Sequence, residues 1–321
     1  MSDSGASRGD VSDFGASRGD VSDSGASPVH PGLPRLPSFG VVVLTQGGRP
    51  ADLARGLGSL LSQVGVDLDI VVVGNGWQPV GLPPGVRGHG LPENLGIPAG
   101  RNAGVPLVSG ELLFFLDDDA SLPGDTVLAR MAAQFAVDPE LGLIQPRVVD
   151  PEGRPSPRRW TPRVRVGDPS RSSPAMSVWE GAVALTRSAF SYSGGWPEEF
   201  WYAHEGIELA WRVWDGGFHV RYDGEIEVHH PAIQPTRHAE FYRLQARNRV
   251  WLARRNLPLP LAPLYVLNWA AVSGMRMRSV WAWKETLRGY LEGLRVPCGQ
   301  RRPMSWHTVW RMGRAGHPPL I

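Results

Sequence analysis

The 321-residue sequence predicts an α/β fold with a mostly parallel central sheet flanked by helices. Two mostly apolar runs rich in β-branched residues, 39–44 and 68–73, are typical of strands. The segment between them, 50–63, starts with a proline and places its leucines at helical spacing. Strand, helix and strand in this order form a βαβ unit, which predicts parallel pairing.

Glycine-rich turns separate the second and third predicted strands. The second strand ends at 74–77, where two glycines and Asn75 indicate a turn that faces a ligand. In 94–104, Pro98 can start a helix, and the glycines let the backbone come close to a ligand. A helix N-terminus together with Arg101 would suit a phosphate, whereas a purely structural glycine-rich loop explains the same residues.

The third predicted strand leads into the most informative motif of the chain. In residues 111–120, five bulky apolar residues run directly into Asp117, Asp118 and Asp119. These acids emerge at the carboxyl end of a buried strand, where open α/β sheets bind ligands. Their hard oxygen donors suit Mg²⁺ or Mn²⁺ bridging to substrate phosphates. Taken alone, the stretch is explained equally well by a solvated acidic turn that caps the next helix.

Further alternation of helices and strands follows the acidic motif. A helix is predicted at about 125–136 and a strand near 141–149. Residues 150–177 are rich in proline, arginine and serine and show no apolar period, so we expect a long loop. Strand character returns at 178–186.

The next helix, predicted over about 205–216, carries two candidate acids. Glu208 and Arg212 form an i,i+4 pair, and the apolar side chains share one stripe: Ile207, Ala210, Trp211 and Trp214. Glu205 lies in the first turn, where the helix dipole favours a carboxylate. This position alone therefore gives Glu205 a structural explanation as well as a catalytic one.

A last strand is predicted near 218–228 and ends in paired histidines. His229, the first of the pair, would bring an imidazole beside the acids if this strand joins the same sheet. A pair of surface histidines is the alternative explanation.

Both ends of the chain fall outside this α/β pattern. Residues 1–38 combine a ten-residue repeat with a proline-rich linker, which predicts a disordered tail. The folded α/β domain is expected over 39–256 and a helical, basic region over 257–321. From Arg237 onward the chain holds 15 arginines and lysines against three acids. This end should face an anionic membrane surface, or its helices should pack on the α/β domain.

Composition favours a cytoplasmic protein. With 42% apolar residues the chain can bury a large core, and its single cysteine, Cys298, excludes an intramolecular disulfide framework. The sequence has no apolar run of ~18 residues and no secretory signal, so we expect a cytoplasmic location, with peripheral attachment to the inner face of the cell membrane as an option.

In order and spacing, the motifs resemble a family 2 glycosyltransferase with the GT-A fold, over roughly 39–256. The residues that carry this resemblance are Thr45, Ser62, Gln63, Asn94, Leu95, Gly96, Arg101, Asn102, Gly110, Glu111, Asp117, Asp118, Asp119, Trp179, Glu180, Gly181, Glu205, Arg212, His229, Arg247 and Asn248. The resemblance implies a nucleotide-diphospho-sugar donor, a divalent metal held by the acidic motif, and inversion at the anomeric carbon.

The resemblance also assigns roles to individual residues. It implies that Asp119, Asp117 and His229 hold Mg²⁺ or Mn²⁺, and that Glu205 is the catalytic base, with Glu208 as the alternative. Residues implied in donor binding are Thr45, Asn75, Asn94, Arg101, Asp117, Asp118 and Arg247.

Two positions depart from the family pattern. Members usually end the second strand with an aspartate that reads the donor base, where this chain has Gly74 and Asn75. They usually carry two adjacent acids at the start of the later helix, where this chain has Glu205 and Gly206. These departures keep a catalytically inactive sugar-nucleotide-binding relative open as an interpretation.

The expected function is inverting, metal-dependent transfer of a sugar from a UDP- or dTDP-linked donor to a hydroxyl of a cell-envelope glycan or lipid-linked acceptor. A leaving diphosphate gains negative charge, which a metal and cations stabilise, and an acceptor hydroxyl needs a base. A nucleotidyltransferase is an alternative, although its glycine-rich basic signature is poorly represented by 45–50. No nucleic-acid docking motif is recognisable, so we expect no nucleic acid partner.

Overall fold

The protein is described by a computed structural model that covers residues 36–163, 165–232, 239–277 and 279–320. From Leu36 onward the chain forms one compact unit. The predicted disordered repeat at 2–27 and most of the proline-rich linker lie outside the described residues.

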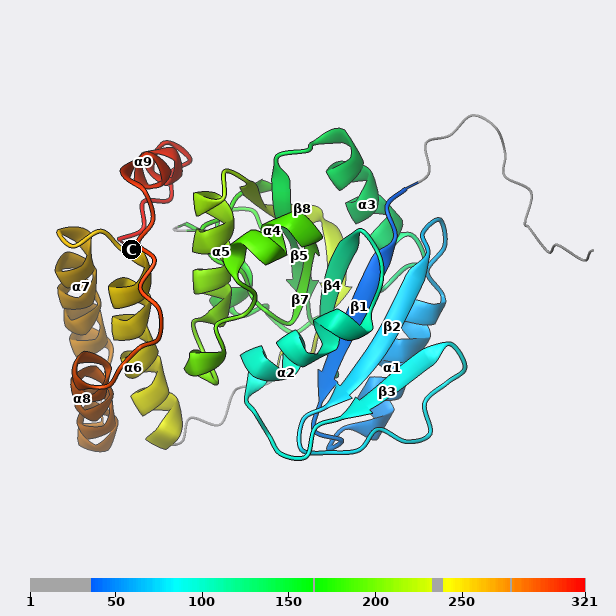
Figure 1. The fold of residues 1–321 in the computed structure, drawn as a ribbon, viewed down its shortest axis with the longest axis horizontal. Helices are drawn as coiled ribbons and strands as arrows, with labels where there is room; N and C mark the ends of the chain where they lie inside the picture. The colour runs from blue at the N-terminus through cyan, green and yellow to red at the C-terminus, as the bar shows by residue number, and fades with distance from the viewer. Residues whose placement is uncertain (1–35, 164, 233–238, 278, 321) are drawn as a thin grey trace, which may run out of the picture. The chain divides into compact units, whose positions relative to one another are not determined.

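A mixed, mostly parallel sheet forms the centre of this unit (Figure 1). Among the described residues its strand order is β3-β2-β1-β4-β7-β5-β8-β6. The pairs β1–β2, β1–β4, β2–β3 and β5–β8 are parallel, whereas β7 runs antiparallel to both β4 and β5, and β6 antiparallel to β8. The strands are β1 Phe39–Thr45, β2 Leu68–Gly74, β3 Val86–Gly90, β4 Leu112–Asp117, β5 Leu141–Val149, β6 Ser173–Pro174, β7 Ala182–Thr186 and β8 His219–His229.

Helices cover both faces of the sheet. Apolar residues of α1 and α3 share one core cluster with one face, and residues of α4, α5 and α6 share the other cluster with the opposite face. The helices are α1 Pro50–Leu61, α2 Ile97–Gly104, α3 Val127–Val137, α4 Arg187–Ser193, α5 Glu205–Asp215, α6 Ala239–Asn256, α7 Leu261–Arg276, α8 Val280–Arg295 and α9 Trp306–Arg314, with 3₁₀ turns at Val105–Leu107, Arg158–Trp160 and Glu198–Phe200. The predicted α/β class with a central sheet between helices is confirmed.

The apolar run in β1 is continuous because the strand is buried on both sides. Val41 and Val43 belong to the core cluster of α1 and α3, and Val42 belongs to the other cluster. Side chains alternate along a strand, so both faces need apolar residues. Each such side chain contributes about 1.5–3 kcal/mol when it is fully buried. Helix α2 then packs closely on the Val42 side, where a Cβ on Gly104 would lie only 2.5 Å from Val42 Cγ1.

The predicted helical C-terminal region is also present. Helix α6 packs against α8, where Arg243 pairs with Glu292 at 2.7 Å. Close approach of these helices requires small residues, since a Cβ on Gly289 would lie 2.1 Å from the Arg243 carbonyl oxygen. Within the described part of the chain, no helix combines the length and apolarity that a membrane span needs.

Several elements differ from the sequence prediction, among them β3, the loop 150–177 and the strand expected over 178–186. β3 is absent from the prediction because Val86–Gly90 holds a single apolar residue and pairs only with β2 at the sheet edge. The predicted loop 150–177 contains a 3₁₀ turn and the two-residue strand β6. The strand predicted over 178–186 begins only at Ala182, because Trp179 N–H donates to the side chain of Gln145 instead of joining the sheet ladder.

Candidate active site

The acidic motif lies at the carboxyl edge of the parallel strands. The register of β1 and β4 places Leu44 beside Asp117, so Thr45 ends its strand next to the acids. Thr45 Oγ1 donates a hydrogen bond of 2.6 Å to Asp118 Oδ2. Arg49, just before α1, pairs with Asp118 at 2.9 Å and also pairs with Asp119. The structure thus joins Thr45 to Asp118 and adds Arg49, which the sequence analysis did not single out.

Arg101 brings a second cation to this edge from helix α2. Its guanidinium lies 2.8 Å from Asp117 Oδ1 and 4.7 Å from the centre of the Trp196 ring. Arg101 is buried, and one of its terminal nitrogens has no hydrogen-bond partner among the described residues. A buried donor without a partner is costly, so this nitrogen suits an anionic ligand such as a phosphate.

Asp117, Asp119 and His230 form a candidate metal site. One ligand atom from each residue lies within 4.8 Å of the others, and His230 Nε2 is 3.0 Å from Asp119 Oδ1. Two carboxylates and one imidazole are a donor set that suits Mn²⁺ or Mg²⁺ together with substrate oxygens. The residues present therefore fit the divalent metal that the fold implies.

The histidine that faces the acids is His230 and not the expected His229. The backbone N–H of His229 donates to the Ser121 carbonyl, and its own carbonyl accepts from Ser121 N–H. Successive side chains of an extended chain point to opposite sides. Because the backbone of His229 pairs with Ser121, the side chain of His230 points to the side of the acids and that of His229 points away. The assignment of His229 as a metal ligand is corrected to His230 on this geometry.

Burial and hydrogen bonds give the acids different proton affinities. Burial raises the pKa of Asp118 to about 6, against the hydrogen bond from Thr45. Burial also acts to raise the pKa of Asp119, but the hydrogen bond and charge of His230 outweigh it and lower the pKa below its ordinary value. Burial acts to lower the pKa of His230, and the hydrogen bond to Asp119 raises it overall. In the absence of a metal ion, Asp119 and His230 thus each favour the charged form of the other.

Asn75 and Asn94 shape the loop in front of α2. Asn75 Nδ2 donates to Asn94 Oδ1 at 2.9 Å and to the Gly96 carbonyl at 3.0 Å, and Asn75 Oδ1 accepts from Leu95 N–H at 2.8 Å. At the other end of this loop, Ile97 N–H donates to the Trp201 carbonyl. These amides hold the loop next to the segment that leads into α5.

Glu205 opens α5 directly after a strained segment. Trp201, Ala203 and His204 have φ between 62° and 72°, which side-chain-bearing residues adopt at a cost of about 1–3 kcal/mol. Glu205 is 3% exposed, and its Oε2 has no hydrogen-bond partner among the described residues. Burial raises the pKa of Glu205 to about 8, and the charge of Glu180 adds to this effect. Glu205 is therefore a buried carboxyl with a free oxygen beside a second acid.

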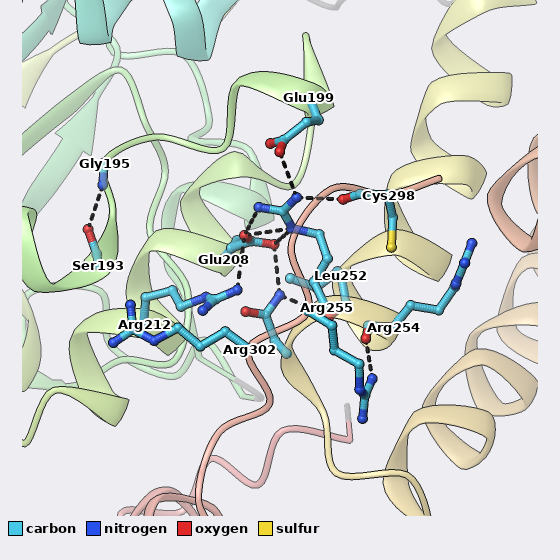
Figure 2. Close-up of polar contacts among 12 residues, drawn as sticks. Ser193, Gly195, Glu199, Glu208, Arg212, Leu252, Arg254, Arg255, Cys298 and Arg302 are labelled. Carbon is cyan, nitrogen blue, oxygen red and sulfur yellow. Dashed lines mark hydrogen bonds and ion pairs between the residues drawn. The ribbon is translucent and has the colours of Figure 1, made fainter. Parts of the chain in front are cut away.

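Glu208, the alternative base, is enclosed by partners (Figure 2). Both of its oxygens accept from Arg255, the shortest contact being 2.8 Å, and Asn256 Nδ2 donates to Oε2 at 2.7 Å. The expected partner Arg212 is 3.7 Å away. Glu208 thus has a structural ion pair with α6, which sequence spacing did not indicate.

Arg247 makes contacts other than those expected of a donor-binding residue. Its guanidinium donates to the Phe200 carbonyl at 3.0 Å, lies 3.5 Å from Glu292 and stacks over the Trp251 ring at 4.2 Å. These contacts join α6 to α8 and to the turn before α5. The described contacts of Arg247 include none of the three acids of the 117–119 motif.

The sequence match covers the first part of the α/β unit. Residues 41–191 match the family described as glycosyl transferase family 2. A relative from Mycobacterium tuberculosis, the pre-mycofactocin glycosyltransferase, is 27% identical over 172 residues, which cover 51% of this chain and 33% of the relative. The chain therefore spans about a third of the length of this curated relative. Residues 41–191 belong to a family 2 glycosyltransferase domain, as the motifs indicated.

Solved structures confirm the GT-A glycosyltransferase fold. A fragment of S. aureus TarS has a TM-score of 0.55 at 14% identity and covers 80% of this chain and 81% of its own. The mannosyltransferase PcManGT from Pyrobaculum calidifontis, in complex with GDP-Man and Mn²⁺, gives 0.52 at 16% identity, covering 88% and 80%. GalNAc-T7 with UDP, GalNAc and Mn²⁺ gives 0.59 at 14% identity, covering 89% and 58%.

Proposed function

We propose that this protein is a metal-dependent, inverting glycosyltransferase that uses a nucleotide-diphospho-sugar. The observation that carries the proposal is the cluster of Asp117, Asp119 and His230 beside the buried Arg101, at the carboxyl edge of a GT-A sheet. Similar folds bind GDP-Man with Mn²⁺ and UDP with Mn²⁺, which supports a sugar nucleotide and a divalent ion here. Mn²⁺ and Mg²⁺ both suit this donor set.

Different residues would bind the metal ion and the diphosphate while the bond to the sugar breaks. When bound, a divalent ion supplies positive charge that stabilises the leaving diphosphate. Asp117, Asp119 and His230 would hold this ion, and the free nitrogen of Arg101 would donate to a phosphate oxygen. Fixed donors of this kind stabilise charge that develops in the transition state.

A carboxylate at the start of α5 removes the acceptor proton, and Glu205 is our candidate. As the hydroxyl proton moves to the carboxylate, the oxygen electron pair forms a bond to the anomeric carbon. The bond from that carbon to the diphosphate breaks, and its electron pair leaves with the phosphate oxygen. Attack opposite the leaving group inverts the anomeric centre. A positioned base of this type accelerates the reaction by ~10²–10⁴-fold.

The end of β2 bears on donor-base recognition. A Cβ on Gly74 would lie 1.9 Å from the Trp77 carbonyl oxygen, so the turn has no room for the aspartate found in relatives. The amide of Asn75 is committed to the 94–96 loop. We propose a UDP- or dTDP-linked donor whose base is bound by other groups at this edge.

The C-terminal helices suggest where the acceptor comes from. Tryptophans at 281, 283, 306 and 310 are exposed in a region rich in arginine. Aromatic and cationic side chains together favour the surface of an anionic bilayer. We propose a cell-envelope glycan or lipid-linked acceptor at the cytoplasmic membrane face.

A screen of nucleotide sugars tests this function. UDP-, dTDP- and GDP-linked sugars are added to the protein with Mn²⁺, with Mg²⁺ or with excess chelator, and the melting temperature is measured. We expect one donor class to raise the melting temperature only when the metal is present, and then to be turned over with an added acceptor. Stabilisation without turnover would favour an inactive sugar-nucleotide binder. No stabilisation by any donor would reject the proposal.

A further inference from the structure

At the start of α5, a carboxylate from another segment lies where the family motif predicts a second acid. Gly206 follows Glu205 at this position. A Cβ on Gly206 would lie 2.5 Å from Oε1 and 2.8 Å from Cδ of Glu180. In an aspartate at 206, the carboxyl carbon would lie one C–C bond, about 1.5 Å, from this Cβ position. The Glu180 carboxylate therefore occupies the region into which the missing acid would project.

Backbone contacts hold Glu180 in this place. Gly206 N–H donates to Glu180 Oε1 at 2.9 Å, so the carboxylate sits at the N-terminus of an 11-residue helix, where negative charge is favoured. On either side of it, Trp179 N–H donates to Gln145 at 2.6 Å, and the Gly181 carbonyl accepts from Asp117 N–H at 2.9 Å. Glu180 is thus one residue away from a direct backbone contact with the acidic motif.

The same approach explains why residue 206 is glycine. A Cβ there would also lie 2.4 Å from the Val178 carbonyl oxygen. A backbone carbonyl cannot swing away as the end of a side chain can, so the segment that carries Glu180 excludes any larger residue at 206. The packing of the 178–180 segment on α5 therefore explains both the absence of an acid at position 206 and the presence of the Glu180 carboxylate there.

The two glutamates differ in access. Glu205 is buried, whereas the residue Glu180 is partly exposed as a whole. We propose that Glu180 is a second catalytic carboxylate of this site. The base is then a pair of carboxylates and not Glu205 alone, with Glu180 receiving the acceptor proton and Glu205 completing the pair. This inference rests on the proposed glycosyl transfer. The proton leaves the acceptor oxygen for Glu180 as that oxygen bonds to the anomeric carbon and the diphosphate departs with its bonding pair.

Electrostatics support a pair that acts together. Burial raises the pKa of both glutamates, and the charge of Glu180 further raises the pKa of Glu205. Among the facing groups, Arg101 lowers both pKa values and Asp117 raises both. The pKa of Tyr202 is raised, first by burial and then by the charges of the two glutamates. The negative charge of each carboxylate thus favours the protonated form of the other carboxyl.

Glu180→Gln tests the assignment without changing the packing. Glutamine has the same size and can still accept from Gly206 N–H, but it cannot take the proton. We expect the transfer rate to fall by ~10²-fold or more, with metal-dependent donor stabilisation unchanged. The acidic limb of the remaining pH profile should move to lower pH, because the like charge beside Glu205 is gone. Glu140→Gln is the matched control, since Glu140 is exposed at the opposite edge of the sheet, just before β5.

Infrared difference spectra provide a readout that does not need turnover. Wild-type protein should show a protonated carboxyl group whose titration moves to lower pH in Glu180→Gln and stays unchanged in Glu140→Gln. An unchanged carboxyl signal in Glu180→Gln, or transfer at the wild-type rate with the wild-type pH profile, would overturn the inference. If wild-type protein binds no sugar nucleotide, the proposed function fails instead, and the infrared comparison still decides whether the two carboxyls interact.

Discussion

Replacing Glu208 by glutamine should destabilise the fold without removing the base. The Glu208 side chain is 4% exposed and that of Arg255 is 8% exposed, so solvent screens their contact little. Removing one charge of a buried pair costs ~3–5 kcal/mol. Glutamine keeps an oxygen that can accept from Arg255, and Glu199 remains 3.1 Å from that guanidinium, so we expect the lower end, ~3 kcal/mol.

This loss can be measured as a melting temperature. In a folded unit of this size, 1 kcal/mol corresponds to about 2 °C, so Glu208→Gln should melt ~6 °C lower. Donor turnover at a temperature well below the transition should stay close to wild type. A double-mutant cycle with Arg255→Met isolates the pair, and the coupled loss should be smaller than the sum of the single losses. Normal melting together with abolished transfer would refute this reasoning and make Glu208 the base.

Four further outcomes follow from the site and the N-terminal end of the chain. Asp119→Asn should abolish metal-dependent donor stabilisation and turnover while the fold persists, with Asp138→Asn as the control; full activity of the Asp119 variant in chelator would contradict the metal assignment. Glu205→Gln should reduce transfer ~10²-fold with donor binding retained. Because the folded-state pKa of Glu205 is raised to about 8, metal-free wild-type protein should lose stability as pH rises from about 4.5 to 8, and Glu205→Gln should weaken this trend in melting temperature. Deleting residues 1–27 should leave melting temperature and turnover nearly unchanged, since their repeat holds few large apolar residues, and a drop of several degrees would show that they pack on the protein.

The sheet could be predicted from sequence where burial on both faces left a pattern. β1, β2, β4 and β5 are mostly apolar, and each was predicted at nearly the observed bounds. β3 leaves no such pattern because its side chains are partly or fully exposed at the edge. α4 was missed because it begins directly after β7, with Thr186 as the last strand residue and also the N-cap.

The sequence could predict only those site contacts that form where neighbouring parallel strands end. Thr45 meets Asp118 because β1 and β4 are parallel neighbours, and parallel strands end at the same edge. The choice between His229 and His230 depends on one local pairing with Ser121, which periodicity does not reveal. Glu180 lies within the recognised motif, but its approach to Gly206 is a tertiary contact between distant segments.

The tie between Glu208 and Arg255 extends beyond the α/β domain. Arg255 also donates to the carbonyl of Cys298, and Asn256 accepts from Met304 N–H, so the last part of the chain closes over the buried charges. A fragment cut at Asn256 would open this enclosure to water and expose apolar surface that Met304 and Met312 now cover. The smallest piece that folds independently should therefore include α9, far beyond the 41–191 segment by which the family is recognised.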